Sequence, residues 1–306
     1  MDFGKLDNIS DVDFTLPADH PRTLPLLQAA RQVEGASQKP TVFVGCPVWS
    51  NKNWVGKIYP NSAKEKDFLY QYARQFNTIE LNVTHYQSPT PETIEKWKSA
   101  VPTHFKFCPK FPQAISHDAQ LSGVQRQTTD FCEAVLGLGE NLGTTFLQLG
   151  PSFDHKKLPL LASFLQSLPP TLPVAVEFRN PVWFSDAALW LETLDLLQRY
   201  HAGTVIADVA GRRDVLHQSL TTPTFTLRFV GNELHRTDYT RVDAWVQRLK
   251  TWLEAGLQTA YIFVHCGSNN QAPELADYWI KQINKHCGLE VDEPRFLPKV
   301  VQGSLF

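Results

Sequence analysis

The sequence has almost no net charge and few cysteines. Its 306 residues carry 29 Lys and Arg against 31 Asp and Glu, a formal net charge of −2. This balance argues against a general electrostatic grip on nucleic acid, so we expect no direct nucleic-acid binding. The five cysteines form no CxxC pair. They therefore favour a reducing, cytoplasmic location over a disulfide framework.

The sequence also has no pattern typical of membrane insertion. The N-terminus carries four aspartates within 13 residues and lacks the apolar core of a signal peptide. Residues 158–176 contain no charged residue and are long enough to cross a bilayer. Four prolines interrupt this stretch, so it predicts a helix, a turn and the start of a strand instead. We expect no membrane partner.

Common catalytic and cofactor signatures are missing as well. The chain has no HExxH, HxH, GxSxG or P-loop motif. Gly137, Gly139 and Gly143 precede a predicted strand, so they indicate a loop rather than a dinucleotide cradle. A metal site could draw on Glu177, Asp208 and His265, but nearby arginines would compete with a cation. We expect no cofactor and no metal.

Short runs of β-branched and aromatic residues alternate with segments of helical periodicity. The runs predict eight strands, at residues 41–46, 78–83, 104–110, 145–150, 174–179, 203–208, 224–230 and 259–266. The periodic segments predict helices at residues 67–73, 91–100, 129–138, 160–168, 186–200, 242–255 and 274–286. Only a short helix is expected at 215–220, after the sixth strand.

Eight βα units over about 250 residues indicate a TIM-like (β/α)8 barrel of the α/β class. An open doubly wound sheet is the alternative, but it would need a Gly-rich turn after the first strand. We expect an N-terminal extension at 1–40, the barrel at 41–288 and a short C-terminal tail at 289–306. A helix at 24–33 would cap the barrel or pack on its flank.

The alternation of side chains along each strand locates the expected chemistry. Successive side chains point to opposite faces, and in a barrel the apolar set faces the helices. The polar set then faces the lumen near the carboxyl ends of the strands, where barrel active sites lie. We expect these residues to be Glu80, Asn82, Lys106, Lys110, Gln148, Glu177, Arg179, Asp208, Arg228 and His265. A self-satisfied ion network that only supports the barrel is the alternative.

Glu80 and Glu177 are the candidate general acid and base, with Lys106, Arg179 and Asp208 completing the catalytic set. Glycoside hydrolysis would use such a carboxylate pair. Aromatic side chains expected at the mouth, Trp49, Trp54, Tyr59, Tyr86 and Trp183, would suit sugar faces.

The expected ligand is a small anion, phosphate included. The loops after strands seven and eight contain Gly231, Gly267 and Asn269, and barrels often bind phosphate through such loop amides. The remaining ligand-binding candidates are Asn82, Lys110, His117, Gln148, Trp183, Arg228 and His265.

An ordered series of short motifs resembles the YecE-like family, also called domain of unknown function 72 (DUF72). The series is Gly45-Cys46-Pro47-Val48-Trp49, Thr78-Ile79-Glu80-Leu81-Asn82, Phe105-Lys106-Phe107, Ile115-Ser116-His117, Gln148-Leu149-Gly150-Pro151 and Val176-Glu177-Phe178-Arg179. The resemblance covers roughly residues 41–286. It implies a TIM-like barrel and no particular reaction. The sequence departs from the family pattern just after Arg228 and around His265.

Three functions from different classes follow. The first is an enzyme acting on a polar anionic small molecule or phosphoester, and the second is a ligand-binding barrel without turnover. The third is a DNA-maintenance accessory protein. The last five residues, Gln302-Gly303-Ser304-Leu305-Phe306, resemble the peptide that docks bacterial proteins on the sliding clamp. There Gln302, Leu305 and Phe306 would make the contacts.

Overall fold

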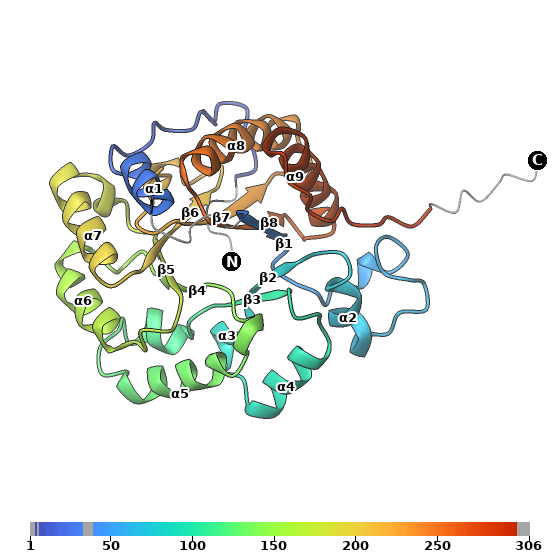
Figure 1. Cartoon of the computed structure of the whole chain (residues 1–306), viewed down its shortest axis with the longest axis horizontal. Helices are drawn as coiled ribbons and strands as arrows, with labels where there is room; N and C mark the ends of the chain where they lie inside the picture. The colour runs from blue at the N-terminus through green and yellow to red at the C-terminus, as the bar shows by residue number, and fades with distance from the viewer. Residues whose placement is uncertain (1–3, 5, 33–38, 299–306) are drawn as a thin grey trace, which may run out of the picture.

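Eight parallel strands form a ring with helices around it (Figure 1). This computed structural model describes residue 4 and residues 6–32 and 39–298. The strands are β1 (Thr41–Gly45), β2 (Thr78–Leu81), β3 (Lys106–Pro109), β4 (Thr145–Leu149), β5 (Val174–Phe178), β6 (Gly203–Asp208), β7 (Thr224–Gly231) and β8 (Thr259–Cys266). All eight predicted strands are confirmed, and so is the TIM-like α/β fold.

The helices predicted from periodicity are present with shifted ends. The helices are α1 (Thr23–Arg31), α2 (Phe68–Tyr72), α3 (Val83–Tyr86), α4 (Pro91–Ser99), α5 (Gln125–Leu136), α6 (Leu158–Ser167), α7 (Ala187–Arg199), α8 (Arg236–Ala255) and α9 (Ala272–Cys287). Helix α8 starts six residues earlier than expected, and α3 is a helix that the sequence did not predict. Thr90 caps α4 by accepting from the Thr93 amide, and Asp186 caps α7 through the amides of Ala188 and Leu189. Among the described residues, no helix is both long enough and apolar enough to cross a membrane.

The barrel is not one continuous hydrogen-bonded sheet, which corrects the expectation of full closure. One sheet has the order β1-β8-β7-β6-β5-β4, and β2 pairs with β3 in a second. Between β1 and β2 the side chain of Asn77 supplies hydrogen bonds in place of a backbone ladder. Its Oδ1 accepts from Val44 N at 2.8 Å and its Nδ2 donates to Val42 O at 3.0 Å. At the β3–β4 seam, Phe111 N donates to Phe146 O at 3.0 Å.

No α-helix follows β6, contrary to the short helix expected at 215–220. That connection holds only a 3-10 turn, η7 (Arg213–Val215). The N-terminal helix α1 occupies the vacant position between α7 and α8 (Figure 1). Arg22, beside α1, forms an ion pair with Asp195 of α7, and Arg31 donates to Glu254 O of α8. The extension thus completes the helical layer on the barrel's flank.

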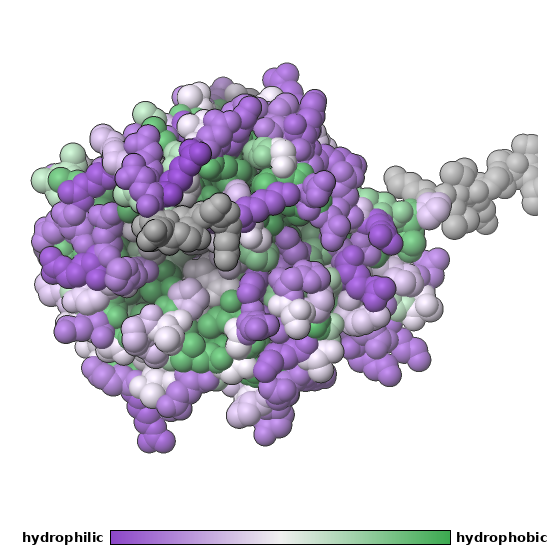
Figure 2. Space-filling model, viewed as in Figure 1, coloured by the Kyte–Doolittle hydropathy of each residue, from purple (hydrophilic) through white to green (hydrophobic). Residues whose placement is uncertain are grey.

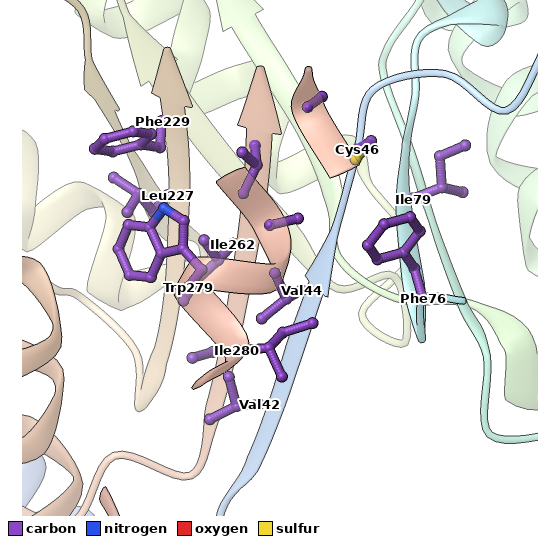
Figure 3. Close-up of a cluster of buried hydrophobic side chains, with 14 of the residues drawn as sticks. Val42, Val44, Cys46, Phe76, Ile79, Leu227, Phe229, Ile262, Trp279 and Ile280 are labelled. Carbon is purple, nitrogen blue, oxygen red and sulfur yellow. The ribbon is translucent and has the colours of Figure 1, made fainter. Parts of the chain in front are cut away.

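The main core lies between the strands and the helices. Figure 3 shows Trp279 and Ile280 of α9 beside Val42 and Val44 of β1, with Ile262 of β8 next to them. On the face in Figure 2, hydrophilic residues dominate the outer rim and hydrophobic ones gather nearer the centre. A second cluster joins α5, α6 and α7 to β4 and β5. Burial of these faces is the main stabilising contribution to the fold.

The lower lumen is filled mostly by aromatic side chains rather than branched aliphatics. Phe43 stacks on Tyr261 with ring centroids 5.0 Å apart, and Phe146 stacks on Phe263 at 6.4 Å. The small side chains of Cys108, Ala175 and Val205 complete this layer. It gives the charged side chains above it an apolar floor.

Replacing Leu27 tests whether α1 belongs to the barrel. Leu27 is fully buried in the main core, so Leu27→Ala should lower the free energy of unfolding by about 2–5 kcal/mol. Urea unfolding measures the change, with Leu191→Ala on the half-exposed side of α7 as the control. A cost below that of the control would mean that α1 is only an appendage.

Candidate active site at the barrel mouth

One guanidinium bridges two carboxylates inside the lumen. Arg228 on β7 donates from Nε and Nη2 to the two oxygens of Glu80 on β2, both at 3.0 Å. Its Nη1 lies 3.1 Å from Glu177 Oε2 on β5. Both carboxylates are buried, and both residues lie where the alternation along their strands predicts. We call Glu80, Glu177, Arg179 and Arg228 the charge cluster.

Further donors saturate each carboxylate. Glu80 accepts from Asn82 Nδ2 at 2.8 Å and from His265 Nε2 at 2.8 Å. Glu177 accepts from Arg179 Nε at 2.7 Å and from Gln148 Nε2 at 2.9 Å. A carboxylate that accepts several charge-assisted hydrogen bonds is held ionised and oriented.

The surroundings keep both carboxyl groups deprotonated. Burial alone would raise the pKa of Glu80, but the Arg228 guanidinium and His265 outweigh it and hold the pKa well below its usual range. For Glu177 burial is likewise outweighed, by Arg179 and Arg228, and the pKa falls to about 2. Neither group therefore has the raised pKa that a general acid needs at neutral pH.

Lys110, directly after β3, lies beside the charge cluster. Its Nζ donates to Gln148 Oε1 at 2.9 Å and lies 5.9 Å from the centre of the Phe146 ring. Across the described residues it forms no ion pair, and its side chain is buried. Burial, with Arg228 adding to it, lowers the pKa of Lys110 to about 7. This amine can gain or lose a proton at neutral pH.

Two histidines flank Lys110, and the sequence indicated only one of them. His117 Nδ1 is hydrogen-bonded with Ser116 Oγ at 2.8 Å, and the centroid of its ring lies 5.1 Å from that of His85. His85 Nδ1 donates to Phe111 O at 2.8 Å, which leaves Nε2 as a buried acceptor without a partner in the described chain. Burial and the charge of Lys110 lower the pKa of His85 to about 4. The signal for His85 was its place three residues after Asn82, in the segment following β2.

Asp208 lies outside the charge cluster, so its expected lumen position is wrong. It shares a strand face with Ile206, and both side chains point to the helices. Its carboxylate pairs with Arg241 of α8 at 2.8 Å and accepts from Trp245 Nε1 at 2.6 Å. Arg213 is a further ion-pair partner. Asp208 anchors a helix to the barrel wall.

Three other candidates also lie away from the charge cluster. Lys106 opens β3 whereas Lys110 follows its end, and Lys106 bonds the Glu140 carbonyl at the opposite end of the lumen. Trp183 is fully buried beside Phe178, with its indole N–H donating to a backbone carbonyl. Asn269 has a φ of +62° and shapes a turn.

The loops expected to bind phosphate already hold carboxylates of the protein. The Asn232 amide after β7 donates to Asp238 Oδ2 at 2.8 Å. The Ser268 amide after β8 donates to Glu233 Oε1 at 3.3 Å. A second anion would be repelled there, so the structure does not favour these loops as the phosphate site. Lys110, whose amine bonds a neutral amide within the described residues, is the lumen cation that remains for such a ligand.

The possible metal set is also dispersed. Asp208 faces α8, whereas Glu177 and His265 face the lumen. Across residues 6–32 and 39–298, no three His, Cys, Asp or Glu side chains gather as a cation would require.

The fold and the charged mouth define a TIM-like barrel with an ion-paired lumen. The family model "Protein of unknown function DUF72" matches residues 43–298. The UPF0759 protein YecE of Escherichia coli K12 is 31% identical over 286 residues, which cover 87% of this chain and the whole relative. UPF0759 protein YunF of Bacillus subtilis is 24% identical over 156 residues, 47% of this chain and 52% of that protein.

Solved structures agree on the fold. A DUF72 family protein from Enterococcus faecalis V583 superposes with a TM-score of 0.64 at 19% identity, over 83% of this chain and 98% of that one. A DUF72 family protein from Thermotoga maritima gives 0.60 at 24% identity, over 81% of this chain and the whole of that one. The chain belongs to the DUF72 family, as its motifs predict.

Removing Arg228 tests the electrostatic design of the charge cluster. Arg228→Met leaves two buried carboxylates short of their shared partner and should cost about 3–5 kcal/mol of unfolding free energy at pH 7. In the wild type the lowered pKa of Glu177 contributes stability that is fully present above about pH 4.5. This stability is lost as the pH falls towards 2. The variant carboxylates protonate more easily, so its deficit should shrink on acidification.

Urea unfolding of both proteins from pH 7 to pH 4 measures this trend. Arg126→Met on the exposed surface of α5, where the side chain is 93% exposed, is the control and should change little. A deficit that stays constant with pH would contradict the electrostatic explanation.

Proposed function

We propose that this protein is an enzyme acting on a small polar anion, with the charge cluster as a fixed electrostatic frame and Lys110 as its titrating group. The observation that carries the proposal is Lys110 itself, a buried amine whose only hydrogen-bond partner in the described structure is a neutral amide. An anion beside it would supply the missing counter-charge. Arg179 and Arg228 line the same lumen, but Glu80 and Glu177 balance their charges, so a protonated Lys110 carries the positive charge in excess.

This proposal changes the roles expected from the sequence. Glu80 and Glu177 were the candidate acid and base, but their cationic partners keep both pKa values low. We assign them the orientation of Arg228, Arg179 and Gln148. Proton transfer falls to Lys110, whose pKa of about 7 suits work near neutral pH. A ligand-binding barrel without turnover is the alternative. It would use the same residues and would bind its ligand without converting it.

Binding of inorganic phosphate tests the anion site. A ligand specific for the folded state raises stability by RT ln(1 + [L]/Kd), about 2.7 kcal/mol at a hundredfold excess over Kd. Phosphate should therefore raise the thermal unfolding midpoint of the wild type, and Lys110→Met should remove most of the rise.

Lys157→Met is the matched control for this measurement. Lys157 also combines a glutamine oxygen with an aromatic ring, since its Nζ bonds Gln120 and lies 5.6 Å from the centre of Phe153, but it stands outside the lumen. Its removal should leave the phosphate effect intact. Equal midpoints with and without millimolar phosphate, or an equal loss in both variants, would overturn the anion site.

We propose docking on the sliding clamp as a second function, favoured by one sequence observation. The five residues Gln302-Gly303-Ser304-Leu305-Phe306 combine a register-setting glutamine with two adjacent apolar side chains. They lie outside the described residues. Leu305 and Phe306 would fill an apolar groove, and the Gln302 amide would fix the register by hydrogen bonds.

If the chain docks on the sliding clamp, removing the two apolar side chains of residues 302–306 should abolish binding. Purified bacterial sliding clamp should retain the wild-type chain, and replacing both Leu305 and Phe306 by alanine should abolish retention. Replacing the neighbouring Val300 and Val301 by alanine is the control, because it removes apolar surface from the same tail. Equal retention of all three proteins, or retention of none, removes the proposal.

A further inference from the structure

The Lys110 amine is buried beside the charge cluster and, within the described residues, makes no direct contact with a carboxylate. The whole residue is 4% exposed, although the stem of a lysine alone could be buried with the charge left in water. The Nζ instead meets one amide oxygen and the face of an aromatic ring. An ammonium has three N–H donors, of which one is accepted within the described residues. A neutral amine has two N–H groups and a lone pair, so Gln148 leaves it one N–H and the lone pair.

Gln148 is fixed in the orientation that this arrangement needs. Its Nε2 donates to Glu177 Oε2 at 2.9 Å, and Glu177 is itself held by Arg179 and Arg228. Because the amide nitrogen is committed to the carboxylate, the amide oxygen must face Lys110. The charge cluster therefore positions the amine without giving it a counter-ion. Buried lysines beside other cations are the ones that act as nucleophiles in proteins.

We infer that Lys110 attacks the carbonyl carbon of an anionic substrate, such as a 2-oxo acid or a phosphorylated ketone, and forms a Schiff base with it. The inference rests on the proposed anion site and names its substrate class. Burial and the Arg228 charge favour the reactive neutral form of the amine, since they lower the Lys110 pKa to about 7. The guanidinium groups of Arg179 and Arg228 are the donors in the same lumen that suit the carboxylate or phosphate of such a substrate, which would share them with Glu80 and Glu177.

The chemistry balances without any further reactant. The Nζ lone pair forms a bond to the carbonyl carbon, the C=O π electrons move to oxygen, and a proton from nitrogen reaches that oxygen to give a carbinolamine. The nitrogen lone pair then forms C=N as the hydroxyl leaves with a second proton as water. One proton from solvent gives the iminium. Burial and the charge of Lys110 lower the pKa of both His85 and His117, so both imidazoles are neutral at pH 7.

Reductive trapping of the full chain tests the inference. The protein is incubated with pyruvate, and separately with dihydroxyacetone phosphate, and sodium borohydride then converts the imine to a stable amine. Intact mass should rise by one pyruvic acid less one oxygen atom, once per chain, and peptide mapping should place the adduct on Lys110. Lys110→Arg should lose it, whereas the matched Lys157→Arg should keep it.

The outcomes separate this inference from the anion site. Peptide mapping of the wild type locates the adduct even if Lys110→Arg fails to fold. No adduct with either probe, or one spread over surface lysines and unchanged in Lys110→Arg, overturns the Schiff base while leaving phosphate binding to stand on its own result. An adduct on Lys110 that inorganic phosphate does not slow keeps the nucleophile and removes the anion site.

Discussion

The double ion pair of Arg228 is the interaction on which the barrel mouth depends. Backbone ladders divide the strands into two sheets, and β2 belongs to one while β5 and β7 belong to the other. Arg228 on β7 joins Glu80 on β2 to Glu177 on β5, so one guanidinium spans the gap between the sheets. Buried ion pairs of this kind contribute little net stability by comparison with an apolar core, but losing one partner is costly. The network therefore specifies an arrangement more than it stabilises a fold.

That arrangement explains why the site contains both inert and titrating groups within a small volume. The carboxylates take nearly all of the donors around them and are fixed as anions. The Lys110 amine contacts an amide oxygen, that of Gln148, and the face of the Phe146 ring. Its pKa falls because burial opposes the charged form and Arg228 adds repulsion, while both carboxylates offset part of this effect. Burial and the neighbouring charge cluster together thus bring the pKa of Lys110 close to neutral pH.

Much of the fold and half of the site follow from strand periodicity. Glu80, Glu177 and Arg228 each alternate with apolar neighbours, and their lumen positions could be predicted from that pattern alone. The lumen position predicted for Asp208 is wrong because β6 is buried on both faces. A charged residue at the end of such a strand does not show which face its side chain takes. The predicted position of Lys106 in the site is wrong because alternation specifies which face of the strand a side chain takes but not its height along the barrel.

The seams and the helical layer depend on contacts that no local pattern carries. Asn77 replaces backbone hydrogen bonds on β1 through a side chain that any loop could contain. The connection after β6 has no α-helix, and α1 fills the place from more than 170 residues away in the sequence, a separation shown by the pair of Arg22 with Asp195. Loop-closure entropy grows only slowly with such a separation, so a distant segment can serve as well as a local one. Helix α1 is consequently part of the barrel's wall, although the family model begins only at residue 43.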